Sequence, residues 1–172
     1  MPNPGRDPTV FNKDGTWYLI CLKYIEDFQY AFIGYRWTGS TWESDPAIVS
    51  GLDIAYHRAS TVFYKDETWY LIAGESFPGI FMGFTWTGSA WESDPAIVSG
   101  LPDLGSDATP DVFYKDGTWY LISGPGYYID PFQRTFYGFH YQYPTTKPDL
   151  IPTSLQPTIC TSTSSTRSQQ QS

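Results

Sequence analysis

The seven tryptophans of this 172-residue chain recur at fixed positions, and their spacing could serve carbohydrate binding. An indole ring can stack on a sugar ring, and equivalent rings in successive repeats would give several weak sites whose affinities combine. Packing of one repeat against the next is the alternative, and strict repetition favours it. We take Trp37 and Trp86 as candidate ligand-binding residues. The three sets are Trp17, Trp69 and Trp119, then Trp37 and Trp86, then Trp42 and Trp91.

A segment that occurs only once offers a second candidate binding site. Residues 127–132 (Tyr-Tyr-Ile-Asp-Pro-Phe) are found in the third of three repeats, and loops that differ between otherwise similar units often carry function. Tyr127 and Tyr128 are therefore candidate ligand-binding residues, with tolerated loop variation as the alternative. His57 and His140 have no ligand-like partners in the sequence, which predicts no metal site and no cofactor.

The elements that must position these residues are β-hairpins. The string Val-Phe-Tyr-Lys-Asp-Gly-Thr-Trp-Tyr-Leu-Ile at residues 112–122 recurs at residues 62–72 with Glu67 for the glycine, and at residues 10–20 with Asn12 for the tyrosine. A short apolar run, an Asp-Gly pair and a second apolar run predict a hairpin, because both residues of a type I′ turn need positive φ. The chain is therefore expected to be built around three hairpins.

Each hairpin belongs to a longer repeat, whose scale predicts a β-propeller. Corresponding residues lie 52 and 50 positions apart in successive units. Four strands in about 50 residues is the scale of one propeller blade. Residues 69–72 are apolar on both faces, as in stacked blades, whereas a two-sheet sandwich, the alternative, leaves one face of each sheet wet. The expected strands are residues 9–13, 16–22, 30–37 and 41–45 in the first unit, and 61–65, 68–73, 80–86 and 90–94 in the second.

The third unit supplies three strands, at residues 111–115, 118–123 and 135–143, and Pro144 stands where the turn to a fourth should follow. Because closed propellers hold at least about four blades, we expect a piece of a longer propeller or, alternatively, a unit that associates with copies of itself. The fold prediction is an all-β chain with two complete four-stranded antiparallel blades and an incomplete third. The predicted propeller region is residues 1–144, with blades at about 8–52, 60–101 and 110–143.

Composition and charge exclude some partners. The net charge of -8 and pI of about 4.5 argue against nucleic acid, whose phosphates are bound by clustered Lys and Arg. No apolar run is long enough to cross a bilayer, and residues 1–7 lack the apolar core of a signal peptide. Aromatic residues make up 19% of the chain, which suits the half-buried surfaces of β-strands.

The composition changes in residues 145–172, where Pro, Ser, Thr and Gln dominate, and this segment is predicted to be a linker or a disordered tail. Within it, Lys-Pro-Asp-Leu-Ile-Pro-Thr-Ser-Leu at residues 147–155 resembles the opening strand of CARDB-type adhesion domains of bacterial and archaeal surface proteins. The resemblance implies that the parent protein is extracellular or attached to the cell surface.

The first and third hairpins resemble those of a known enzyme class. Asp-Pro-Thr-Val-Phe at residues 7–11 and Thr-Pro-Asp-Val-Phe-Tyr at residues 109–114 resemble the inner blade hairpins of furanosidase-type glycoside hydrolases (arabinanases and β-xylosidases), which are five-bladed propellers. The resemblance implies that Asp7 is the catalytic base, with Asp111 of the second motif as a further candidate. Glycoside inversion also needs a protonated acid about 6.5–9.5 Å away, for which Glu75 is the candidate.

Departures from the enzyme pattern decide the preferred function. Ala59 stands in the second unit where Asp7 stands in the first, so one expected carboxylate is missing. We therefore expect a non-catalytic extracellular repeat module for surface adhesion or carbohydrate binding, whose partner is a glycan. The alternatives are a glycoside hydrolase domain acting through Asp7 and Glu75, and a structural spacer without a ligand. Catalysis requires unique carboxylates that converge, whereas a repeat binder requires equivalent sites on each blade.

Overall fold

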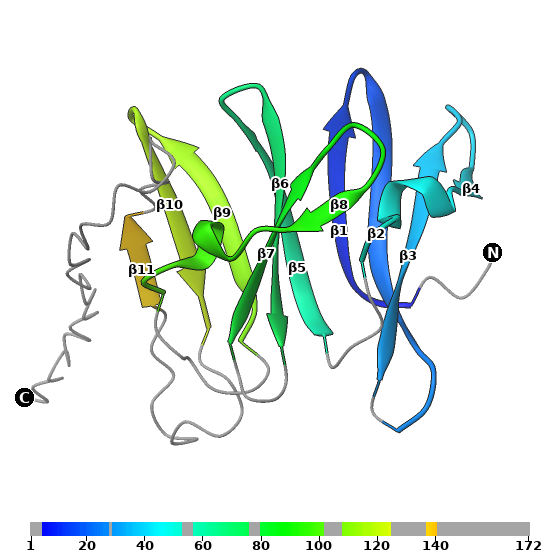
Figure 1. Cartoon of the computed structure of the whole chain (residues 1–172). Helices are drawn as coiled ribbons and strands as arrows, with labels where there is room; N and C mark the ends of the chain where they lie inside the picture. The colour runs from blue at the N-terminus through cyan, green and yellow to red at the C-terminus, as the bar shows by residue number, and fades with distance from the viewer. Residues whose placement is uncertain are drawn as a thin grey trace, which may run out of the picture.

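The computed structural model of the chain describes residues 5–27, 29–52, 57–75, 80–101, 108–124 and 137–140. Within these residues the chain forms eleven β-strands in three antiparallel sheets, together with two 3₁₀-helices. The sheets follow one another along the chain, and each strand pairs with the next strand in sequence (Figure 1). The prediction of an all-β chain of blade-like sheets, two with four strands and one with three, is confirmed.

The three sheets repeat one plan. The first sheet contains β1 (Arg6–Lys13), β2 (Thr16–Tyr24), β3 (Tyr30–Trp37) and β4 (Trp42–Ser44), followed by the 3₁₀-helix η1 (Pro46–Val49). The second contains β5 (His57–Lys65), β6 (Thr68–Glu75), β7 (Phe81–Trp86) and β8 (Trp91–Ser93), followed by η2 (Pro95–Val98). The third contains β9 (Pro110–Lys115), β10 (Thr118–Ser123) and β11 (Tyr137–His140).

The first hairpin of each sheet closes through the turn that the sequence predicts. Both turn residues have positive φ, with values of 52° at Asp14 and 82° at Gly15 in the first sheet. The second sheet has the same turn without a glycine, because Glu67 adopts a φ of 61°. A Cβ atom disfavours this conformation, so the flanking ladder of β5 and β6 holds Glu67 in it.

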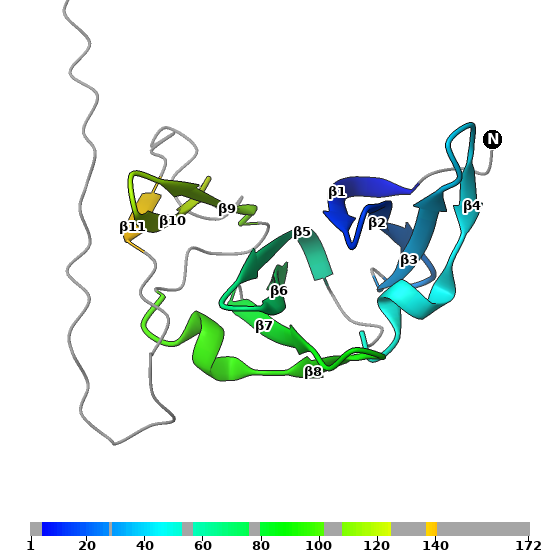
Figure 2. The same ribbon diagram turned by 90° about the horizontal axis from the view of Figure 1, so that it is seen from above.

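The sheets stand side by side around an open arc, with β1, β5 and β9 on its inner side and β4 and β8 on its outer side (Figure 2). β1 contacts β5, and β5 contacts β9. The innermost strands are therefore those that carry Val10, Val62 and Val112, which belong to the repeated hairpin string. A two-sheet sandwich is wrong, because each sheet packs on its neighbours in a row.

The middle sheet is covered on both faces, as the apolar run at residues 69–72 predicts. Leu71 and Ala73 lie in the core shared with the first sheet, whereas Tyr70 and Ile72 lie in the core shared with the third. Successive side chains of a strand point to opposite faces, so one strand contributes to both cores. This pattern explains why β6 is almost continuously apolar.

The inner strands begin earlier than the sequence predicts, at Arg6 in β1 and His57 in β5. In each case the register shifts by one residue: Arg6 pairs with Leu22, but Thr9 pairs with Ile20. The same shift occurs between His57 and Ser60 in the second sheet. The extra residue forms a β-bulge, which bends the strand without ending the ladder. A bulge interrupts the alternation of side chains along a strand, so the sequence predicts that each strand begins only after its bulge.

The outer strands are shorter than predicted, and each is followed by a helical turn that was missed. Pro is favoured at the first position of a helix, and the preceding Asp caps it. The Asp45 carboxylate accepts a hydrogen bond from the Ala47 amide at 3.2 Å, and Asp94 accepts the same bond from Ala96 at 3.1 Å. The repeated Asp-Pro-Ala-Ile-Val segment therefore forms a 3₁₀-helix and not the end of a strand.

Two glycines let these helical turns fold back onto the sheets. A Cβ atom on Gly34 of β3 would lie 2.3 Å from Cγ2 of Ile48, and one on Gly83 of β7 would lie 2.7 Å from Cβ of Ile97. Ile48 and Ile97 are both buried. Because glycine leaves this space empty, the isoleucine of each turn fills it and joins the core between sheets.

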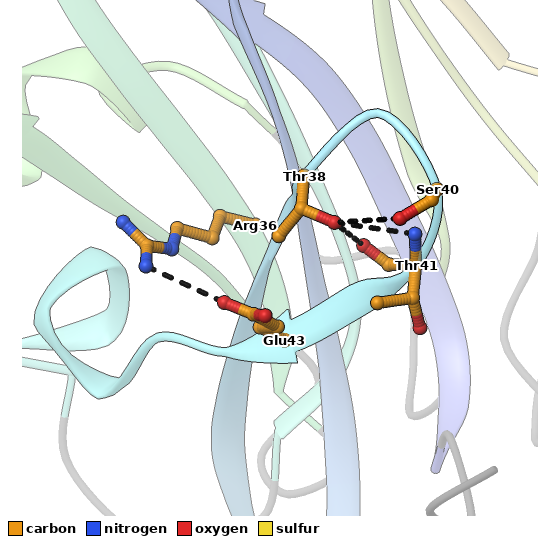
Figure 3. Close-up of polar contacts among 5 residues, drawn as sticks. All are labelled: Arg36, Thr38, Ser40, Thr41 and Glu43. Atoms are coloured by element: carbon orange, nitrogen blue, oxygen red, sulfur yellow. Dashed lines mark hydrogen bonds and ion pairs between the residues drawn. The ribbon is translucent and has the colours of Figure 1, made fainter.

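Residues 37–52 and 86–101 differ only at Thr41 and Ala90, and the turn between β3 and β4 shows why this difference is tolerated (Figure 3). The Thr38 hydroxyl donates to the Thr41 carbonyl at 3.0 Å and accepts from the Thr41 amide at 3.3 Å. In the second sheet, Thr87 makes the same two bonds with Ala90. Only the backbone of the fourth residue is used, so threonine and alanine are equivalent there. Arg36 also forms an ion pair with Glu43 across the strands, at 3.4 Å.

Some predictions fall on other parts of the chain. The tail at residues 145–172, the resemblance at residues 147–155 and the loop with Tyr127 and Tyr128 all lie outside the described residues. In the described ranges, no helix has the length and apolar character needed to span a membrane.

Candidate functional site

Asp7 lies in the bulge of the innermost strand of the first sheet. Its φ is 53°, a left-handed conformation that is uncommon for a residue with a Cβ atom. Its carboxylate lies 3.4 Å from Nε of Arg6, and its side chain is 31% exposed. Bulges and left-handed residues are frequent beside functional sites, where they redirect a side chain. Asp7 thus has the local geometry of a positioned carboxylate.

Glu75 ends β6 at the same end of the second sheet. Its backbone pairs with that of His57, and its amide donates to the Ile80 carbonyl at 2.9 Å. Burial raises the pKa of the Glu75 carboxyl above its usual range, because leaving water disfavours the charged form. A raised pKa increases the fraction of a carboxyl that can donate a proton, which is the property expected of the acid candidate.

Asp111 is the second residue of β9 and is exposed to solvent. Strands β1 and β9 begin, and β6 ends, at the end of the sheets opposite the turns at Asp14, Asp66 and Asp116 (Figure 1). The second and third sheets meet closely there, since a Cβ atom on Gly74 would lie 2.2 Å from the carbonyl oxygen of Ala108. The three predicted carboxylates are therefore on one rim of three neighbouring sheets. We call Asp7, Glu75 and Asp111 the acidic rim.

Each carboxylate of the acidic rim occurs in one repeat only. The position of Asp7 is Ala59 in the second repeat and Thr109 in the third. The position of Asp111 is Thr9 in the first repeat, where the threonine hydroxyl instead binds the Ser60 carbonyl between two sheets. Carboxylates accept hydrogen bonds from hydroxyl groups. The acidic rim therefore offers one set of hydrogen-bond acceptors per chain, whereas the tryptophans recur in each repeat.

The repeated tryptophans mostly pack between sheets. Trp69 lies 5.5 Å from Phe11 of the first sheet, and Trp119 lies 5.5 Å from Phe63 of the second, measured between ring centroids. Trp91 is buried, and its indole nitrogen donates to the Ile48 carbonyl at 2.8 Å. These contacts join each sheet to the one before it.

The two tryptophans predicted to bind ligand are the last residues of β3 and β7, and each pairs with the first residue of the outer strand beside it. Trp37 is exposed and pairs with Trp42 at 5.4 Å, whereas Trp86 is half-buried and pairs with Trp91 at 5.2 Å. Trp17, Trp37 and Trp42 together line an open apolar pocket of about 220 Å³ on the first sheet. Trp17 could not be distinguished from Trp69 and Trp119 by sequence, since exposure depends on which sheet lies next to it.

The structure brings together no metal-ligand set within the described ranges, where no group of three or more His, Cys, Asp and Glu side chains could hold an ion. Cys21 is a buried free cysteine in that part of the chain, and burial raises the pKa of its thiol to about 11. A thiol with that pKa is protonated at neutral pH and is a poor nucleophile. Cys21 therefore serves the core of the first sheet.

Comparison by sequence identifies no relative, because no protein-family model and no curated protein matches the chain. Solved structures do match. The catalytic domain of a GH62 α-L-arabinofuranosidase from Coprinopsis cinerea matches 79% of this chain and 45% of its own length, with a TM-score of 0.56 and 18% identity.

Two further enzymes of a related type match over the same share of the chain. The exo-β-1,3-galactanase 1,3Gal43A from Clostridium thermocellum matches 79% of this chain and 34% of its own length, with a TM-score of 0.54 and 12% identity. GH43B of the Bacteroides ovatus xyloglucan PUL matches 79% and 27%, with a TM-score of 0.52 and 17% identity. This chain spans less than half of each of the three structures. At these identities the likeness concerns the fold alone: the chain shares part of the β-propeller fold of GH43 and GH62 glycoside hydrolases.

Proposed function

We propose that the chain binds a glycan at the acidic rim and does not cleave it. The observation that carries this proposal is the position of Asp7, Glu75 and Asp111, each present in one repeat, on the same rim of adjacent sheets. The fold is shared with enzymes that act on arabinofuranosides and galactans, and this supports a sugar as the ligand.

The chemistry of the rim suits a neutral polysaccharide. Sugar hydroxyls donate hydrogen bonds to carboxylates, and charge-assisted bonds are roughly twice as strong as neutral ones. The chain carries a net charge of -8, which disfavours acidic glycans by repulsion. The ligand class is therefore a neutral pentose- or galactose-containing chain.

Absence of cleavage is proposed because the second repeat has Ala59 where the first has Asp7. General acid and general base assistance each contribute about 10²–10⁴-fold to catalysis, and without a carboxylate at residue 59 the role of the acid rests on Glu75 alone. A role in adhesion at the cell surface is part of this proposal and rests on the likeness of residues 147–155 to an adhesion domain.

Calorimetric titration of the full chain with xylo-, arabino- and galacto-oligosaccharides tests the proposal. We expect one site per chain, and the triple variant Asp7→Asn, Glu75→Gln, Asp111→Asn should bind at least about tenfold more weakly, which corresponds to a loss of about 1.4 kcal/mol. Each substitution keeps the shape of the side chain and removes the charge.

The matched control is Asp116→Asn, which removes an exposed charge at the opposite end of the β9–β10 hairpin. Asn tolerates the φ of 50° at that turn, so the fold should be unchanged. Equal affinity of the triple variant and the control would contradict binding at the rim, and a stoichiometry of several sites per chain would favour the repeated tryptophans.

The second candidate function is glycoside hydrolysis, which the raised pKa of Glu75 favours. In this reading, Glu75 protonates the leaving oxygen and Asp7 activates a water molecule, which attacks the anomeric carbon. Hydrolysis of aryl α-L-arabinofuranosides and β-xylosides by the full chain distinguishes the two. Under our proposal product release stays at the background rate. Turnover that is lost in both Asp7→Asn and Glu75→Gln, but kept in Asp116→Asn, would establish the hydrolase instead.

A further inference from the structure

Successive sheets are joined by one repeated aromatic contact. The phenylalanine of each inner strand stacks on a tyrosine of its own hairpin, and in the first two sheets it also contacts the tryptophan of the next sheet. Phe11 lies 5.7 Å from Tyr18 and 5.5 Å from Trp69, and Phe63 lies 5.4 Å from Tyr70 and 5.5 Å from Trp119. Each sheet thus has a face with phenylalanine and an opposite face with tryptophan.

The two ends of the arc carry one unmatched half of this contact each. Phe113 of the third sheet stacks on Tyr120 at 5.4 Å but is 40% exposed, whereas Phe11 and Phe63 are 6% and 5% exposed. Ile122 on the same sheet is 37% exposed, although Ile20, at the same place in the first sheet, is fully buried. We call Phe113 and Ile122 the phenylalanine end.

The opposite end is the outer face of the first sheet. Trp17 is 49% exposed and lines the apolar pocket with Trp37 and Trp42, and we call these three residues the tryptophan end. Trp91, which corresponds to Trp42, is only 2% exposed because the first sheet covers it. The tryptophan end therefore has the composition of a sheet interface, but none of the three sheets formed by the described residues covers it.

We infer that two copies of this chain associate head to tail, with the phenylalanine end of each against the tryptophan end of the other. Phe113 of one copy then meets Trp17 of the other as Phe11 meets Trp69 within the chain. The contact is heterologous, and such contacts form rings when the rotation closes. Propellers hold about 4–8 blades, and two chains of three sheets make six, within this range, whereas three chains would exceed it.

The inferred contact is centred on the hairpins and not on the outer strands. Within the chain, Trp91 is also held by the residue that follows η1, because its amide donates to the Ser50 carbonyl at 2.8 Å. At the inferred contact, the matching bond would need a 3₁₀-helix after the third sheet, and the described residues of that sheet include none. Trp17 is therefore the residue on which association depends most, and Trp42 contributes less.

Sedimentation velocity of the full chain over a range of concentrations tests this inference. We expect a concentration-dependent dimer of twice the 19.5 kDa of one chain. Trp17→Ala and Phe113→Ala should each weaken dimerisation at least about tenfold, because buried aromatic anchors dominate interfaces. The control is Ile25→Ala, which removes an exposed apolar side chain at the far end of β2 and should leave the dimer unchanged.

Mixing the two variants separates a lost contact from a lost fold. A heterodimer of Trp17→Ala and Phe113→Ala contains one intact Phe113–Trp17 contact, whereas either variant alone contains none. The mixture should therefore dimerise more tightly than either variant. A chain that stays monomeric at every concentration would overturn the inference, as would a dimer that neither substitution weakens. A mixture that dimerises no more tightly than either variant alone would also overturn the inference.

Discussion

At the scale of the residue, Glu75 is a partly buried carboxyl group, and this burial raises its pKa. Its pKa is raised above the value of 4.5 of the free side chain, so the folded state binds more protons than the unfolded state between those two values. Stability changes with pH in proportion to this difference in bound protons. The ionised Glu75 therefore opposes folding above its own folded pKa, and the protonated form does not.

This predicts a pH-dependent gain from Glu75→Gln. Below pH 4.5 the variant and the parent chain should have similar free energies of unfolding, and the variant should become the more stable as pH rises through the folded pKa of Glu75. Urea denaturation at a series of pH values measures the difference. Glu92→Gln, at an exposed position of β8, controls for the loss of one negative charge. A difference that is the same at all pH values would contradict this reading.

At the scale of the element, the hairpins followed from the sequence because their information is local. An Asp-Gly pair between apolar runs determines both the turn and the pairing of its strands. The turn with Glu67 could be predicted only because its neighbours repeat. The bulge at Asp7 could not be predicted in this way, since it depends on pairing with another strand. The 3₁₀-helices after β4 and β8 have a local Asp-Pro signal, but their packing on the sheets also needs the space left at Gly34 and Gly83. Ile48, for example, folds back because Gly34 leaves room for it.

This dependence predicts that glycines at one repeated position tolerate alanine differently. Gly34, Gly83 and Gly138 pair with Ile20, Ile72 and Ile122 in their sheets. A Cβ atom on Gly83 would lie 2.6 Å from the Asp94 carbonyl oxygen, whereas one on Gly138 meets nothing within 4 Å. Gly83→Ala should lower the free energy of unfolding by about 1–3 kcal/mol, as overpacking does, and Gly138→Ala should change it little. Thermal unfolding of both variants checks this, and equal losses would contradict it.

At the scale of the whole molecule, the sequence predicted the stacking of the sheets but not which tryptophans it buries. Trp17 and Trp119 have nearly the same neighbours in sequence, yet only Trp119 lies against a preceding sheet. The acidic rim was predicted as separate candidates, each from its own motif or loop. The topology shows that these residues lie at the same end of the sheets. Neighbouring strands run in opposite directions, so the start of one strand lies beside the end of the next.

The near-identity of residues 37–52 and 86–101 has a consequence for how the chain folds. Either segment carries the Trp-Glu-Ser strand and the helical turn that complete a sheet, so neighbouring units compete for the same partners during folding. Strands exchanged between adjacent repeats would have almost the correct contacts and would be slow to correct. The small differences outside these segments, such as Asn12, Glu67 and Asp7, are what distinguish one unit from the next. The repetition that makes the architecture regular therefore also makes misfolded states with exchanged strands available to the chain.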